Sequence, residues 1–146
     1  MHIHTWLEIN YVYSGSCTQI INNETITLTE GQLCLIYTKV PHAILAAGEN
    51  DMIINILIPK ELLSTAFLSR LSHKGIISDF LINAISKNQI HNHYIIFHSE
   101  NNKKIPRLMK ELLCEYFDKT PYFNEIIESY LAIIFTELYV SSCVIY

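Results

Sequence analysis

The sequence predicts a mainly β domain followed by an antiparallel pair of α-helices. Three observations lead to this fold class. First, short strand-like segments separated by turn residues fill the first 58 positions. Second, two amphipathic segments with helical spacing follow from about residue 104. Third, half of the 146 residues are hydrophobic while 16% are charged. That composition indicates one folded domain with a substantial core. The net charge of −4, without a run of Lys or Arg, gives no sign that this chain alone binds nucleic acid.

The N-terminal strands are predicted from short apolar or alternating segments. Gly, Asn, Ser and Pro, which favour turns, separate these segments. Their close spacing is typical of a sandwich or barrel. The segments are TWLEINYVY (5–13), CTQII (17–21), TITL (25–28), LCLIY (33–37), AILAA (43–47) and MIINILI (52–58).

Helical spacing follows the strands. Pro59 suits the first position of a helix, so we predict a helix over about 60–72 and a second over about 76–87. The segment HYIIF (93–97) is predicted to return to the barrel as a late strand. We therefore place a barrel domain at residues 1–98 and a helical hairpin at residues 99–146.

The hairpin is predicted from two apolar stripes with helical spacing. The first helix begins near Lys104, DKTP interrupts the pattern, and Thr120 and Pro121 are expected at the cap and first position of the second helix. Residues 130–146 are apolar on nearly every face, yet the run is short for a membrane span and carries Glu137, so we expect no membrane insertion. A second copy of the chain is the simplest cover, so we predict a homodimer. The expected dimerisation residues are Leu108, Leu112, Phe123, Ile127, Tyr130, Ile134 and Leu138.

A possible ligand set opens the chain. His2, His4 and Glu8 differ by even numbers, so on a strand they face one side. His42, after Val-Pro, is a fourth candidate if the barrel closes. Imidazole and carboxylate groups bind Zn, Ni, Fe or Mn. Two interpretations stay open: these four residues hold a divalent metal, or they line a pocket that needs none.

The same residues resemble the motifs of the cupin superfamily. Its first motif, His-x-His-x₃-Glu-x₆-Gly, is matched by His2, His4, Glu8 and Gly15. The second is matched in part by a glycine and a histidine at the right separation, although YTK (37–39) replaces its Pro-x-Gly. This resemblance implies a cupin-like, jelly-roll β-barrel.

A narrower resemblance covers nearly the whole chain. The segments EINYVYSG (8–15), LTEGQLCLI (28–36) and VPH (40–42), with the helical pair after them, are similar to the N-terminal sensor domain of AraC/XylS-type transcription regulators. That resemblance implies an effector-binding barrel, helices that pair two subunits, and DNA binding only through helix-turn-helix units C-terminal to the helices. Because the chain stops at Tyr146, where that module would begin, we expect a domain cut from a longer regulator; a natural short form is the alternative.

The resemblance leads to a functional hypothesis. We expect a small-molecule effector to bind the barrel without catalytic residues or a required cofactor. Tyr37 joins the candidates because it offers a hydroxyl and an apolar ring where the second motif has proline. The alternative is a small metal-dependent cupin enzyme of isomerase or dioxygenase type, with Glu8 as a ligand. The predicted effector residues are His4, Glu8, Asn10, Tyr37 and His42, with Val12 and Asn55 as further pocket candidates.

The cysteines indicate the compartment. None of Cys17, Cys34, Cys114 and Cys143 forms a CxxC pair. We interpret them as reduced thiols, with Cys17 and Cys34 packed in the core rather than acting as redox sensors. The N-terminus also shows no signal-peptide pattern, so we expect a cytoplasmic protein.

Overall fold

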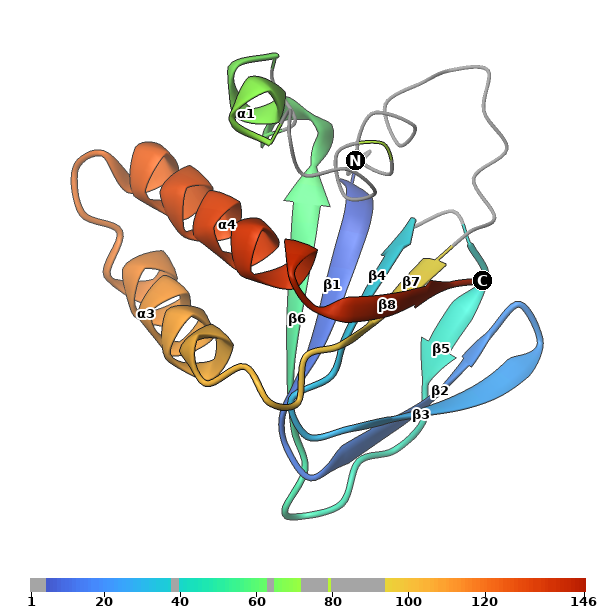
Figure 1. Ribbon diagram of the computed structural model, residues 1–146. Coiled ribbons are helices and arrows are strands. Elements are labelled where there is room, and N and C mark those ends of the chain that lie inside the picture. The colour runs from blue at the N-terminus through green and yellow to red at the C-terminus, as the bar shows by residue number, and fades with distance from the viewer. Residues whose placement is uncertain (1–4, 38–39, 63–64, 72–78, 80–93) are drawn as a thin grey trace.

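The computed structural model describes residues 5–37, 40–62, 65–71, 79 and 94–146. Two antiparallel sheets and two packed C-terminal helices make up the chain, which confirms the predicted fold class (Figure 1). The strands are β1 (Thr5–Ser14), β2 (Ser16–Ile21), β3 (Glu24–Thr29), β4 (Leu33–Tyr37), β5 (His42–Ile44), β6 (Met52–Pro59), β7 (Tyr94–His98) and β8 (Ser142–Ile145). The helices are a 3₁₀ turn (Lys60–Leu62), α1 (Thr65–Arg70), α3 (Lys104–Asp118) and α4 (Phe123–Tyr139).

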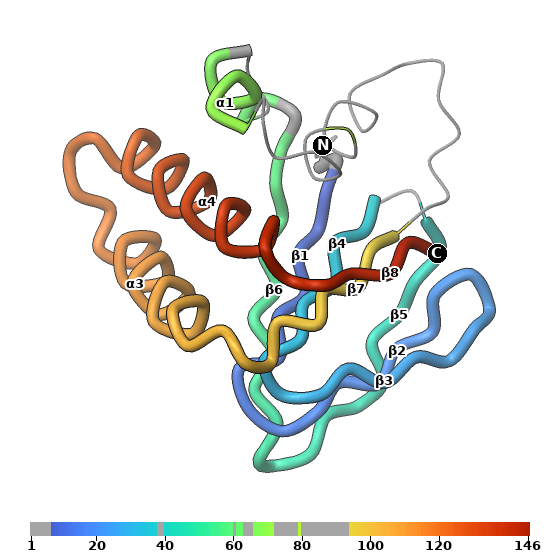
Figure 2. Tube along the Cα trace, in the orientation of Figure 1, coloured from blue at the N-terminus to red at the C-terminus, as the bar shows by residue number. Residues whose placement is uncertain are grey.

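A five-stranded sheet forms the centre of the molecule. Its strand order is β6-β1-β4-β7-β8, and a three-stranded sheet, β3-β2-β5, lies against one of its faces. The helices α3 and α4 lie on the other side, as the trace in Figure 2 also shows. The central sheet is therefore covered on both faces, which explains why all five residues of β4 are buried.

Two tight turns between strands contain residues with positive φ. Asn22 and Asn23 both have positive φ (51° and 65°), which fits the right-handed twist of the β2–β3 hairpin. Gly31 has φ 87°, and a Cβ there would lie 2.8 Å from the Cα of Glu100. Both the backbone angle and the close approach therefore require glycine at this position.

The last strand, β8, was not predicted. Residues 99–146 are not a helical hairpin throughout, because the chain turns after α4 and adds β8 antiparallel to β7. The ring of Tyr146 stacks on that of Tyr94, with centroids 4.9 Å apart. Ser142 to Ile145 include β-branched residues, which suit a strand better than a continued helix.

The helix boundaries agree only in part with the sequence prediction. Pro59 ends β6 directly before the 3₁₀ turn, and α1 lies within the predicted helix over about 60–72. The predicted helix over 76–87 lies in a segment outside the described residues, except for Asp79. Helix α3 begins at Lys104 as predicted, where the side-chain Oδ1 of Asn102 accepts hydrogen bonds from the first backbone N–H groups at 2.9 and 3.2 Å. Helix α4 begins at Phe123 after a left-handed Tyr122, so the predicted cap at Thr120 was wrong.

One core joins the sheet and the helices. The buried residues of β1, β4, β7, α3 and α4 belong to a single cluster, so residues 99–146 pack against the barrel. On β1, Glu8 and Asn10 face the three-stranded sheet, and the alternate residues Leu7, Ile9 and Tyr11 therefore face the helices. Both faces of β1 therefore pack against other elements.

No helix in the described parts of the chain is long and apolar enough to cross a membrane.

Candidate functional site

Three polar side chains meet on the face of the central sheet that looks toward the three-stranded sheet. Asn10 on β1 is paired directly with Asn55 on β6, so their side chains are neighbours on one face. The Nδ2 of Asn10 donates to Oδ1 of Asn55 at 2.8 Å and to Oε1 of Glu8 at 2.9 Å. The strand register thus fixes the orientation of the Glu8 carboxylate.

His42 completes this cluster from the opposite sheet. It begins β5 and pairs with Ile21 of β2. Its Nδ1 donates to the carbonyl oxygen of Val40, and its Nε2 lies 2.6 Å from Oε2 of Glu8. Glu8 and His42 therefore connect the two sheets across the barrel; we call Glu8, Asn10, His42 and Asn55 the inter-sheet site.

The hydrogen bonds of His42 fix how many protons the pair holds. A carbonyl oxygen can only accept, so Nδ1 of His42 carries a hydrogen. The contact between Nε2 and Oε2 requires a second hydrogen, carried by either the imidazole or the carboxyl group. In both arrangements the charges of Glu8 and His42 sum to zero. The inter-sheet site is therefore polar but without net charge.

The inter-sheet site is mostly shielded from solvent, and its exposed member lies on an edge strand. The side chains of Glu8 and His42 are 12% and 16% exposed, and Asn10 is fully buried. Asn55, by contrast, is exposed on β6, which is an edge strand of the central sheet. Asn55 is therefore the member of the inter-sheet site that lies nearest to solvent.

Buried polar atoms without partners line the space between the sheets. Oδ1 of Asn10, both amide atoms of Gln19 and the hydroxyl of Tyr94 have no hydrogen-bond partner among the described residues. Gln19 is fully buried on β2 between Cys17 and Ile21, and Tyr94 is on the same face of its sheet as Glu8 by register. Each such atom lacks the water it would bind outside the protein, a penalty of roughly 1–3 kcal/mol. These atoms are suited to bind a polar molecule between the sheets.

Sequence reasoning missed Gln19 and Tyr94. The sequence pattern could have identified Gln19, because Gln19 is the one polar residue on the inward face of β2. The other inward residues of that strand are Cys17 and Ile21. Tyr94 gave no such signal, because its strand is apolar on both faces and one hydroxyl does not stand out.

The structure brings together some of the predicted site residues and separates others. Glu8, Asn10 and His42 meet, with Asn55 beside them. Tyr37 pairs with Leu7, so it lies on the opposite face of the sheet from Glu8, and this corrects its place in the predicted pocket. Burial raises the pKa of Tyr37. Val12 has the parity of Glu8 and is fully buried. His2 and His4 lie outside the described residues.

The inter-sheet site offers two donors suited to a divalent metal. With a hydrogen on Nδ1 bonded to Val40, the Nε2 of His42 has the orientation of a metal-binding imidazole, and a metal would replace the proton shared with Oε2 of Glu8. Among the described residues, no group of three or more His, Cys, Asp or Glu side chains forms a metal site. Glu8 and His42 alone thus provide half of the four predicted ligands.

The helical pair places its apolar residues differently from the prediction. Leu112, Ile127, Ile134 and Leu138 are buried in the chain's own core. Leu108, Phe123 and Tyr130 are partly buried against the same core. The predicted dimerisation set therefore consists mainly of core residues.

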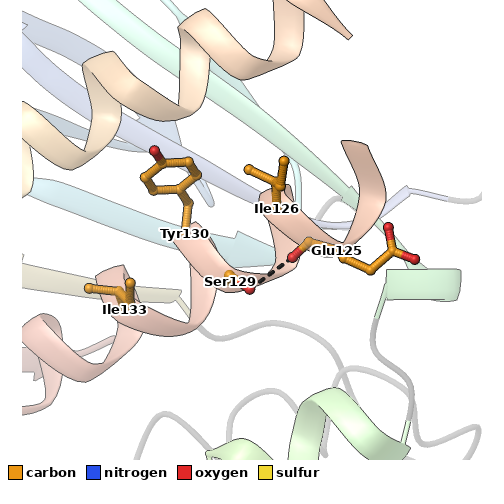
Figure 3. A pocket seen from close by; sticks show the side chains of 5 residues that line it. All are labelled: Glu125, Ile126, Ser129, Tyr130 and Ile133. Atoms are coloured by element: carbon orange, nitrogen blue, oxygen red, sulfur yellow. Dashed lines mark hydrogen bonds between the residues drawn. The ribbon is translucent and has the colours of Figure 1, made fainter. Parts of the chain in front are cut away.

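A second stripe of α4, which shares Tyr130 with the predicted set, faces outward. Ile126, Tyr130 and Ile133 follow one another at helical spacing along one side of the helix (Figure 3). They line a shallow pocket of about 370 Å³, beside a hydrogen bond of 2.8 Å from Oγ of Ser129 to the carbonyl oxygen of Glu125. We call Ile126, Tyr130 and Ile133 the outer stripe of α4.

The comparisons with known proteins support the fold. Residues 1–58 match the family model described as Cupin domain. No curated protein matches the chain. The matched segment is a cupin domain that contains Glu8, Asn10, His42 and Asn55, while β7, α3, α4 and β8 lie beyond it.

Proposed function

We propose that this chain is the effector-binding and dimerisation part of an AraC-type transcription regulator. The effector is a small polar molecule without net charge that binds at the inter-sheet site. The α3–α4 pair joins two copies, and DNA is bound by helix-turn-helix units outside residues 1–146. The observation that carries this proposal is the hydrogen-bonded chain from His42 through Glu8 and Asn10 to Asn55, which lies on an edge strand of the central sheet.

The chemistry between the sheets supports a polar effector. Asn10 and Gln19 present carbonyl oxygens that need donors, and the amide of Gln19 and the hydroxyl of Tyr94 need acceptors. A molecule that carries both hydroxyl and carbonyl groups satisfies both needs. Because the charges of Glu8 and His42 sum to zero, the site has no net charge to hold a strongly ionic ligand.

The position of β1 supports a route from the effector to the helices. Glu8 and Asn10 face the effector, while Leu7 and Ile9, which alternate with them, are fully buried on the face toward α3 and α4. Because a close-packed core has low compressibility and transmits strain, movement of β1 shifts the helices it supports. The strand is therefore the physical link between binding and dimerisation.

The outer stripe of α4 supports dimerisation. Ile133 is 47% exposed, and Ile126 and Tyr130 stay only partly buried. A second copy that packs α4 against α4 removes this apolar area from water. We therefore assign the dimer contact to this stripe, in place of the buried residues predicted from sequence.

A reporter fusion tests the proposal. The chain is fused to a DNA-binding domain that represses a reporter only as a dimer. We expect repression with the native chain and its loss in Tyr130→Asp, while Lys110→Asp on the exposed side of α3 retains it. Equal repression by both variants, or none by the native chain although it is folded and abundant, would contradict the dimerisation half of the proposal.

A metal-dependent cupin enzyme is the second candidate, favoured by the 2.6 Å approach of Nε2 of His42 to Oε2 of Glu8. Glu8 and His42 would hold the metal, which would supply Lewis acidity to a bound substrate. Metal analysis of untagged protein and titration with Zn²⁺, Ni²⁺, Fe²⁺ and Mn²⁺ separate the candidates. Tight stoichiometric binding that Glu8→Gln abolishes would favour the enzyme; a metal content below about a tenth of an equivalent and no tight binding would remove it.

A further inference from the structure

The edges of the two sheets differ in how they are protected against pairing with a further strand. An edge strand leaves backbone N–H and C=O groups free, and proteins restrict their pairing with charged residues, with proline or with very short strands. At the described edges, β3 carries Glu24, β6 ends at Pro59 and β5 has three residues. The four residues of β8 include neither a charged residue nor proline. Strand β8 is therefore the edge best suited to accept another strand.

The surroundings of β8 are apolar as well. No charged side chain follows Glu137 in the sequence up to Tyr146. Val144 and Ile145 are 42% and 49% exposed, although β-branched hydrophobic residues favour the interior of a sheet. A second strand against this edge would cover apolar surface and would bring no like charges of its own kind together.

The hydrogen bonds to β7 show which backbone groups of β8 point outward. Tyr94 and Tyr146 exchange two backbone hydrogen bonds, with N···O distances of 3.4 and 2.9 Å. Because hydrogen-bonded and non-hydrogen-bonded pairs alternate in an antiparallel ladder, Val144 also bonds to β7. Cys143 and Ile145 occupy the alternate positions, so their N–H and C=O groups point away from β7. No described strand lies on that side of β8.

These outward groups match those of a second β8 strand in antiparallel orientation. When Val144 of one copy lies opposite Val144 of the other, Cys143 of each copy lies opposite Ile145 of the other. Each Cys143–Ile145 pair can then exchange two backbone hydrogen bonds. The arrangement is symmetric about a two-fold axis, and the same surface serves on both copies. The edge of β8 is thus complementary to itself.

We propose that β8 pairs with β8 of a second copy and continues the central sheet from one chain into the next. The contact involves few residues, so it is a weak one that forms at high protein concentration. It goes beyond the proposed function, because it uses the edge of the sheet rather than the outer stripe of α4. In the proposed regulator, α4 forms the dimer and β8 joins one dimer to the next.

Disulfide cross-linking tests the pairing and its register. Cys114→Ser and Cys143→Ser first remove the two thiols that are not buried. In this background, Val144→Cys places two thiols at the axis with Cα atoms about 4.5 Å apart, a separation that a disulfide spans. Ser142→Cys is the matched control, because Ser142 is exposed on the same face of β8 but would lie roughly 14 Å from its counterpart. After oxidation with glutathione disulfide, Val144→Cys should give about tenfold more cross-linked dimer than Ser142→Cys.

A charge at the axis tests the contact without a covalent bond. Val144→Lys places two ammonium groups opposite each other, whereas Thr25→Lys places them on β3, where Thr25 is exposed. Both variants are made in the Tyr130→Asp chain, in which the contact through α4 is removed. We expect Val144→Lys to weaken the remaining self-association about fivefold by sedimentation equilibrium and Thr25→Lys to leave it unchanged.

The two measurements keep the inference separate from the proposed dimer. The inference is overturned if Val144→Cys and Ser142→Cys cross-link to the same extent, or if neither does, while both retain the native circular dichroism spectrum. Equal self-association of Val144→Lys and Thr25→Lys would also overturn it. The Val144→Cys cross-link should persist in Tyr130→Asp, and its loss there would show that β8 forms no contact of its own. Failure of the reporter fusion, by contrast, concerns only the contact through α4.

Discussion

Glu8 and His42 are 34 residues apart in the sequence, but Oε2 of one lies 2.6 Å from Nε2 of the other. This contact connects the two sheets and orients the two side chains toward each other. It is also the contact that a metal or a polar effector must reorganise.

Removing the Glu8 carboxylate should destabilise the chain. In Glu8→Ala, Asn10 and His42 each lose an acceptor, so we expect the free energy of unfolding to fall by about 1–3 kcal/mol. Urea denaturation measures this change. Glu49→Ala, at an exposed position, is the control and should change the free energy by less than about 0.5 kcal/mol. Equal effects of the two substitutions would show that the inter-sheet contact contributes nothing measurable.

Gln19→Leu should stabilise the chain in the absence of a ligand. The substitution removes a buried amide that has no partner among the described residues, so the gain should be about 1–3 kcal/mol. Gln32→Leu is the contrasting variant and should destabilise, because Oε1 of Gln32 accepts a 2.8 Å hydrogen bond from the N–H of Thr29. A loss of stability in Gln19→Leu would mean that the amide is already satisfied.

Substitutions at two neighbouring residues of α4 should distinguish an effect on folding from an effect on dimerisation. Ile134 is fully buried and Ile133 is 47% exposed, so Ile134→Ala should lower the free energy of unfolding by about 2–5 kcal/mol. Ile133→Ala should change it by less than about 1 kcal/mol but weaken self-association, as measured by sedimentation equilibrium. The assignment of the two faces fails if Ile133→Ala unfolds the chain or if Ile134→Ala leaves its stability unchanged.

The thiols should differ in reactivity and in their effect on stability at high pH. Burial, with smaller contributions from Glu8 and Cys17, raises the pKa of Cys34 to about 12 from an ordinary value of 9.0. The folded state therefore favours the neutral thiol, and this contribution is complete below pH 9 and is lost as pH rises toward 12. Stability should fall over that interval, and less so in Cys34→Ala.

Reaction with Ellman's reagent checks the same assignment. At pH 8, the exposed Cys114 should react rapidly in the folded chain, while Cys34 should react only after the chain unfolds. Rapid reaction of Cys34 in the folded chain would contradict its burial. It would show as a fast phase that remains when Cys114 and Cys143 are both replaced by Ser and disappears when Cys34 is also replaced by Ala.

The sequence predicted the barrel strands and part of the site for clear physical reasons. Strand β4 begins and ends where its apolar run does, and the Asn22–Asn23 turn was recognisable from residues that tolerate positive φ. Glu8 and His42 were found because their types and spacing are uncommon for a plain strand. These features depend on local pattern, which a sequence records directly.

Other features depend on which neighbour an apolar face meets. In α4, the stripes of Ile127 and of Ile126 are both apolar, so the sequence could not tell which one faces the chain's own sheet and which faces outward. Tyr37 was misplaced because the parity of a strand end is fixed only by its register with Leu7. Strand β8 was missed because its apolar run continues that of the preceding helix.

The most direct test is a thermal-shift screen of small polar molecules that carry both hydroxyl and carbonyl groups, against the native chain and His42→Ala in parallel. We predict that at least one compound raises the melting temperature of the native chain in a saturable manner and changes its dimer fraction by sedimentation. His42→Ala, although folded, should lose the response. If every stabilising compound acts equally on His42→Ala, or none binds the native chain, the inter-sheet site is not an effector site.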